Sequence, residues 1–139
     1  MTANVLLGEV KHDSAPDETG TQNVSYTGSH WSTYPPKLVF HLGTQNSLTQ
    51  ISSNADLSFG FGNASEMASM SYFNENGQGT TDTHMSIQNA DVVTHLGNGA
   101  NITEAASISN LTAATVQLNW DTVIDTGLTF GQLALGGDA

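Results

Sequence analysis

The sequence predicts one all-β domain, an antiparallel β-sandwich or jelly-roll-like fold of about eight or nine short strands. Good helix formers are sparse, whereas the β-branched residues Thr, Val and Ile are common. The 14 glycines recur every few residues, and short runs alternate between apolar and polar side chains. We find no internal repeat or linker, so residues 1–139 are expected to form a single domain.

The first strands are predicted at residues 5–10 and 21–27, separated by an acidic turn at residues 13–20. Two prolines that cannot donate to a β-ladder then mark an edge or a loop. They lead into a strand at residues 37–42, where alternate positions share one face: Leu38, Phe40 and Leu42.

The next strand alternates bulky and small residues, and we expect its bulky side to face the core. The glycines on the small side favour a bulge or a close approach of another backbone. The bulky positions are Leu57, Phe59 and Phe61, the small ones are Ser58, Gly60 and Gly62, and the pattern continues through Ala68, Met70 and Tyr72.

A tight hairpin turn is predicted where the dipeptide Asn76-Gly77 follows this pattern. Oxygen-bearing side chains at residues 74–82 offer an alternative calcium loop, but Met85 stands where such a loop would carry its bidentate Glu. Further strands are expected around Met85 and at residues 92–96. The segment 101–114 also tolerates a helical turn, and we assign it to a strand.

The clearest alternation lies near the C-terminus, where Val116, Leu118 and Trp120 point to one side. We expect this strand and the one at residues 130–137 to close the core of the sandwich.

The charge balance is strongly acidic, with 2 Lys+Arg against 13 Asp+Glu and a net charge of −11. Without clustered basic residues, binding to nucleic acid or to an anionic membrane is not expected. The acidic surplus suits high salt, as in a halophilic source. Ser, Thr, Asn and Gln dominate the remaining polarity and fit an extracellular or virion surface.

No stretch has the ~20 apolar residues of a membrane helix, and the first ten residues lack the features of a signal peptide. Cysteine is absent, so disulfides, thiolate metal sites and cysteine nucleophiles are excluded.

Five histidines carry the remaining catalytic and metal-binding chemistry, and none stands in a metal-binding pair spacing. His41 and His95 follow strand alternation and are interpreted as ordinary strand positions, with a joint metal site as the alternative. A catalytic triad would also need a positioned nucleophile, and no Gly-x-Ser-x-Gly motif occurs. We therefore expect no enzyme, no metal and no cofactor.

The loop at residues 29–36 is the candidate interaction surface, because aromatic side chains stack on sugars or on partner subunits. Its candidate binding residues are His30, Trp31 and Tyr34. The equal alternative for Trp31 is that it caps one end of the core. Four sequons mark possible glycosylation sites: Asn23, Asn63, Asn101 and Asn110.

Several short motifs occur in a fixed order and together resemble a family of small all-β domains in the structural proteins of tailed viruses and prophages. They are Gly20-Thr-Gln-Asn-Val-Ser25, Pro36-Lys-Leu-Val-Phe-His-Leu-Gly43, Phe59-Gly-Phe-Gly62, Leu118-Asn-Trp120 and Leu133-Ala-Leu-Gly-Gly137. The resemblance covers residues 19–137, and the segment 29–34 departs from the family pattern. The chain is also loosely similar to H-type lectins.

This resemblance implies a virion protein on the particle surface, either a capsid decoration or turret subunit or a tail-tip or fibre subunit, assembled in the host cytoplasm. The expected partners are further copies of the chain, in a trimer or pentamer, and other virion proteins. The alternative is a lectin-like module that recognises host surface glycans.

Overall fold

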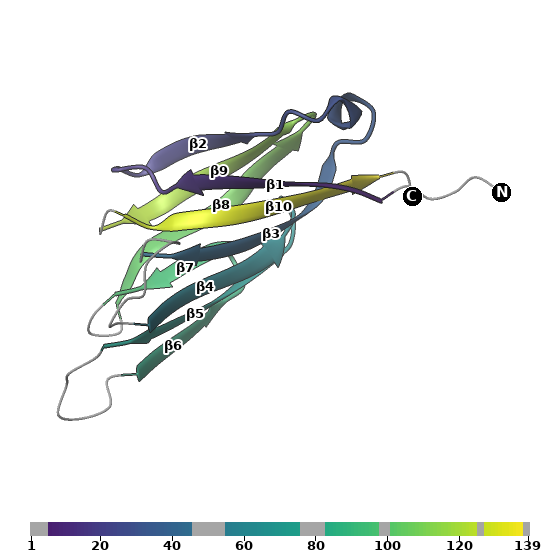
Figure 1. Ribbon diagram of the computed structural model, residues 1–139. Helices are drawn as coiled ribbons and strands as arrows, with labels where there is room; N and C mark the ends of the chain where they lie inside the picture. Colours follow the sequence, from purple (N-terminus) through teal and green to yellow (C-terminus); the bar gives the residue numbers. More distant parts are fainter. Residues whose placement is uncertain (1–5, 46–54, 76–82, 98–100, 125–126, 138–139) are drawn as a thin grey trace.

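The computed structural model describes residues 6–45, 55–75, 83–97, 101–124 and 127–137, and these residues form two antiparallel β-sheets (Figure 1). They contain ten strands and one short 3-10 helix, η1, at Ser29–Ser32. The predicted all-β sandwich is confirmed. Within the same residues, no helix has the length and apolar character to span a membrane.

The larger sheet has six strands in the order β1-β10-β3-β4-β5-β6. Their bounds are β1 Leu6–Ser14, β10 Thr129–Gly137, β3 Pro36–Thr44, β4 Ala55–Gly62, β5 Met67–Asn74 and β6 Thr83–Gln88. The smaller sheet has four strands in the order β2-β9-β8-β7, with β2 at Gly20–Ser25, β9 at Thr115–Val123, β8 at Ile102–Thr112 and β7 at Val93–Leu96.

Most of the chain follows a meander, because consecutive strands pair from β3 to β6 and from β7 to β9. The N-terminal strands close the sheets through long-range pairs, β1 with β10 and β2 with β9. The two C-terminal strands thus lie in different sheets and meet across the core, where the rings of Trp120 and Phe130 are 6.2 Å apart.

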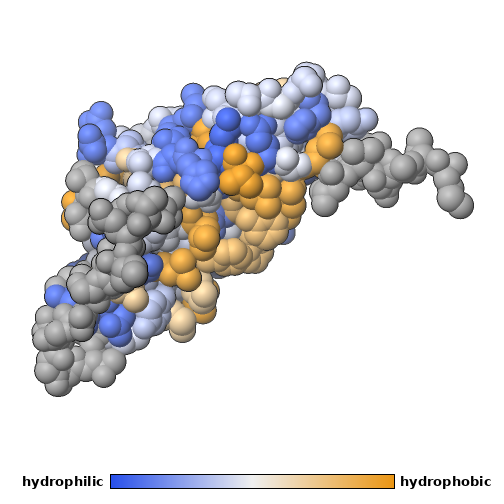
Figure 2. All heavy atoms as spheres, viewed as in Figure 1, coloured by the Kyte–Doolittle hydropathy of each residue, from blue (hydrophilic) through white to orange (hydrophobic). Residues whose placement is uncertain are grey.

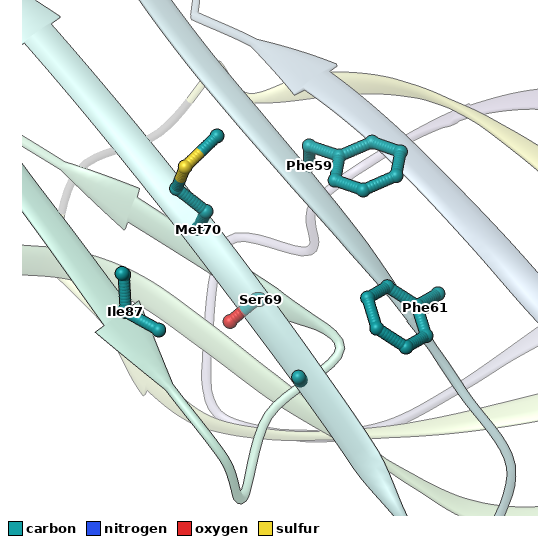
Figure 3. Close-up of a pocket in the computed structure, with 6 residues that line it drawn as sticks. Phe59, Phe61, Ser69, Met70 and Ile87 are labelled. Carbon is teal, nitrogen blue, oxygen red and sulfur yellow. The ribbon is translucent and has the colours of Figure 1, made fainter.

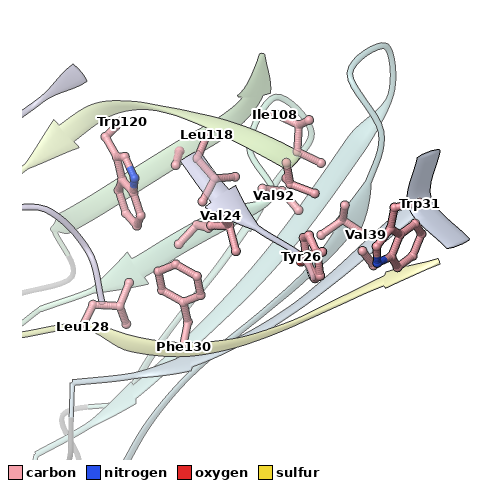
Figure 4. Close-up of a cluster of buried hydrophobic side chains, with 14 residues drawn as sticks. Val24, Tyr26, Trp31, Val39, Val92, Ile108, Leu118, Trp120, Leu128 and Phe130 are labelled. Atoms are coloured by element: carbon pink, nitrogen blue, oxygen red, sulfur yellow. The ribbon is translucent and has the colours of Figure 1, made fainter. Parts of the chain in front are cut away.

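The core lies between the sheets and is built on the alternation of β9 (Figure 4). Val116, Leu118 and Trp120 are buried there, as predicted. Segment 101–114 is a strand, β8, which confirms its assignment. Residues 76–82, which include the predicted Asn76-Gly77 turn and most of the alternative calcium loop, lie outside the described residues, but β5 and β6 pair as an antiparallel hairpin.

The predicted orientation of β4 was wrong. Ser58, Gly60 and Gly62 face the core, while Phe59 and Phe61 point away from it. A side chain at Gly60 would overlap the carbonyl oxygen of Val92, in the segment that enters β7. Gly60 is therefore buried because another backbone lies directly against it.

Candidate functional site

The outer surface of the six-stranded sheet is the most unusual feature of this fold, because its side chains are bulky and apolar. Pairing register aligns them across neighbouring strands: Phe40 lies opposite Phe61, and Phe59 lies between Leu42 and Met70. We call this surface the outer apolar face and define it by Val10, Leu42, Leu57, Phe59, Phe61, Met70, Tyr72, Met85 and Ile87.

These side chains are substantially open to solvent in the single chain. Their exposed fractions range from 36% at Tyr72 to 69% at Ile87. In Figure 2 hydrophobic residues gather over β10, β3 and β4, beside the polar residues that cover the neighbouring part of the molecule. A contiguous exposed apolar area of this kind is rare on monomeric proteins and is typical of an interaction site.

Two shallow apolar hollows lie on this face, one on each side of Phe59. The first is lined by Phe59, Phe61, Ala68, Ser69, Met70 and Ile87 (Figure 3). The second runs along β1, β10 and β3, where the small residue Gly131 leaves space between Val10, Leu42 and Leu133. The face therefore has a recess on either side of the Phe59 ring.

Formal charge is absent from the outer apolar face. Among the described strand positions that point outward from the six-stranded sheet, none is Asp, Glu or Lys. In a chain with a net charge of −11, the acids of the described residues therefore lie elsewhere. The face offers a partner neither ion pairs nor charge repulsion.

The outward side of the four-stranded sheet is polar by contrast. We call it the polar face and define it by Thr21, Asn23, Ser109, Gln117 and Asn119. Its amides and hydroxyls bond to one another, with Gln117 Nε2 donating to Asn23 Oδ1 at 3.1 Å and Ser109 Oγ donating to Gln117 Oε1 at 3.0 Å. The two outer surfaces of the sandwich thus differ sharply in polarity.

The aromatic loop predicted as a binding surface needs correction at Trp31. Its side chain is completely buried, 5.7 Å from the ring of Tyr26, and its indole N–H donates to Glu9 Oε2 at 2.7 Å. Trp31 therefore caps the core, as its alternative interpretation had it, and presents no ring face to a sugar. His30 and Tyr34 are half-buried beside it.

Glu9 holds this loop in place. Its carboxylate also accepts hydrogen bonds from the backbone N–H groups of Thr27 and Gly28. Desolvation raises the pKa of Glu9, but these bonds, together with those from Trp31 and Lys11, outweigh it and lower that pKa to about 2. The Glu9 carboxylate thus has a structural role.

A buried ionic cluster joins the two sheets at the other end of the molecule. His95 on β7 contacts Asp56 Oδ2 through Nε2 and Glu104 Oε2 through Nδ1, each at 2.9 Å. Burial lowers the pKa of His95, but hydrogen bonds and charges from both carboxylates outweigh it and raise that pKa to about 9. Sequence reasoning missed this cluster because its members come from three separate strands.

A joint metal site was the alternative interpretation of His41 and His95, which lie in different surroundings. The carboxylates bind opposite ring nitrogens of His95 and so do not converge on one point. His41, on β3, is buried against Phe130, with ring centroids 4.9 Å apart. The described part of the chain contains no group of three or more residues arranged to hold a metal ion.

The four sequons differ in their surroundings. Asn23, Asn101 and Asn110 are exposed, whereas Asn63 is half-buried and its Oδ1 accepts hydrogen bonds from the N–H groups of Ser65 and Glu66. Glycosylation of any of them stays a prediction.

Comparison of the chain with protein-family models, curated proteins and solved structures finds no match.

Proposed function

We propose that this chain is a non-catalytic structural subunit on the surface of a virus particle, as a capsid decoration or turret subunit or as a tail-tip or fibre subunit. The observation that carries the proposal is the outer apolar face. Leaving an apolar surface of this size in water is costly, and its burial is the dominant favourable term in most protein–protein associations.

The polar face supports the same role from the opposite side. Hydroxyl and amide groups bond to water without ion-pair partners, which suits a surface directed outward from an assembly. The order of the motifs from Gly20 to Gly137, which resembles small domains of tailed-virus structural proteins, supports placement in a virion. The proposal includes assembly of the chain into a trimer or pentamer, contacts with other virion proteins and a location in the virion.

Immunogold electron microscopy of purified particles tests the proposal. Antibodies raised against the recombinant chain should label particles at regular positions, and head or tail labelling would separate the two placements. Particle-free lysate from the same infected culture serves as the control. Detection of the chain in that lysate but never in purified particles would overturn the proposal.

Glycan recognition is the second candidate, and the half-buried Tyr34 and His30 are its remaining aromatic loop residues. A Tyr34→Ala variant with an intact fold should lose binding on a glycan array if this loop reads a sugar. An array that gives no signal with the intact protein would remove this candidate and leave the structural role.

A further inference from the structure

The area of the outer apolar face matches what one partner contributes to a stable interface. An aromatic side chain buries about 150–250 Å², so nine large apolar side chains that are one-third to two-thirds exposed present on the order of 700 Å². The largest apolar patch on a typical monomer is about 300–600 Å², and a standard interface buries about 800 Å² on each partner. This face has the dimensions of an interface.

The distribution of charge favours a second copy of the chain as the occupant. A partner selected by charge would be basic and would need acids to meet it, but the described outward positions of this sheet carry none. Two copies that meet through this face bring uncharged surfaces together. Interfaces between identical subunits are more apolar than other interfaces, as this face is.

The shape of the face suits self-association because well-exposed side chains and recesses lie on one surface. A two-fold contact requires each copy to offer both a feature and its complement. Phe59 separates the two hollows and the more exposed Ile87 and Val10 border them, so a side chain of one copy can enter a recess of the other while the reverse contact forms by symmetry. Sheets packed face to face in this way interdigitate their side chains.

We propose that the outer apolar face packs against the same face of a second copy, forming a two-fold dimer with the polar faces directed outward. The proposal deepens the assembly role above by naming the partner of this surface, and it rests on that role. A ring of three or five subunits would have to use other surfaces of the chain.

Association of the purified full chain tests the proposal. Sedimentation equilibrium at about 100 μM should give twice the 14.6 kDa mass of one chain. Ile87→Glu places a carboxylate in the face, and burial of that unpaired charge should weaken dimerisation by at least about 100-fold. The matched control Asn119→Glu adds the same charge to the polar face and should change the dissociation constant by less than about threefold.

A cross-linking experiment keeps the test decisive if a charged variant folds poorly. Because the chain lacks cysteine, single-cysteine variants give unambiguous products. Met70→Cys should be joined to a second copy by a short bis-maleimide, whereas Asn119→Cys should remain single. The circular dichroism spectrum and thermal midpoint of each variant establish that the fold is intact.

A monomeric wild-type chain would overturn the proposal, as would a dimer that tolerates Ile87→Glu or a cross-link at Asn119→Cys in place of Met70→Cys. These results are separable from a failure of the virion role. A chain that labels particles but is monomeric defeats only the dimer, while a dimer that never labels particles defeats only the virion assignment.

Discussion

At the scale of single residues, His95 has the largest expected effect on stability among the interior side chains. It places a positive charge between two buried carboxylates, and no other described residue does so. Its ring ties β7 to Asp56 of the six-stranded sheet and to Glu104 of β8. Removing one partner of a buried ion pair costs about 3–5 kcal/mol, since it leaves uncompensated charge.

His95→Gln should therefore lower the free energy of unfolding at pH 7 by about 3–5 kcal/mol, measured by urea denaturation. His12→Gln, an exposed change on β1, is the control and should stay within about 0.5 kcal/mol of wild type. A loss at His95 no larger than at His12 would contradict the ionic role.

The same histidine sets an alkaline limit to stability. Its folded-state pKa of about 9 lies above the ordinary 6.5, so its contribution is complete below pH 6.5 and disappears as pH rises through about 9. Wild-type stability should fall between pH 7 and 10, and His95→Gln should flatten this decline. Parallel declines in both proteins would show that another group is responsible.

His41 acts in the opposite direction. Desolvation lowers its pKa to about 3, and neither ring nitrogen has a hydrogen-bond partner among the described residues. In the unfolded chain His41 takes up a proton near pH 6.5, whereas in the folded chain it stays neutral until about pH 3. The free energy of unfolding should therefore fall as pH drops through this window. His41→Leu should reduce that acid loss and should retain or raise stability at pH 7 by up to about 1 kcal/mol. The pH dependence of urea midpoints for both proteins checks this.

At the scale of elements, the interior of the sandwich depends on how closely the segment entering β7 approaches β4. The middle inward positions of β4 and β5 are small: Ser58, Gly60, Ser69 and Ser71. Hydroxyl groups serve this approach directly, because Ser71 Oγ accepts the N–H of Leu96 at 3.0 Å and Ser69 Oγ bonds to Thr94 Oγ1 at 2.6 Å. Polar side chains thus replace the usual apolar filling where two backbones meet.

Gly60→Ala should destabilise the fold by at least about 2 kcal/mol, because its methyl group would collide with the carbonyl of Val92. Gly131→Ala on β10 is the control, because an added Cβ meets nothing nearer than 3.9 Å there; since Gly131 borders a recess of the outer apolar face, both variants are compared at a concentration that keeps the chain monomeric. The control should unfold within about 1 kcal/mol of wild type. Equal effects of the two substitutions in urea denaturation would contradict the close approach.

At the scale of the whole molecule, acidity and assembly are coupled. Each copy carries a net charge of −11, so association must overcome long-range repulsion even though the proposed contact surfaces are uncharged. The Debye length falls from about 10 Å at 0.1 M salt to about 3 Å at 1 M, which removes most of this repulsion.

Raising sodium chloride from about 0.1 M to about 1 M should therefore tighten dimerisation, measured by sedimentation equilibrium, and should raise the thermal midpoint of unfolding. An association that relied on ion pairs would weaken over the same range. The direction of the salt effect thus separates an apolar contact from a charged one.

The sequence by itself determined that the chain is an all-β sandwich, because alternation with a period of two follows directly from residue order. It also determined that Val116, Leu118 and Trp120 share a face. Alternation defines the two sides of a strand but does not say which side faces the core. Side-chain size alone favours the bulky side, and for β4 this is the wrong side.

Only the tertiary structure decided the orientation of β4. The close approach of Val92 leaves no room for a side chain at Gly60, and Phe59 and Phe61 therefore point outward. The same holds for Trp31, whose burial depends on Glu9 of a distant strand. It also holds for His95, because one partner, Asp56, lies 39 residues before it in the chain and the other, Glu104, lies on the neighbouring β8. The alternating residues that form the outer apolar face can therefore be read from the sequence, but their exposure cannot. Contacts between residues far apart in the chain selected which of its two sides would be exposed.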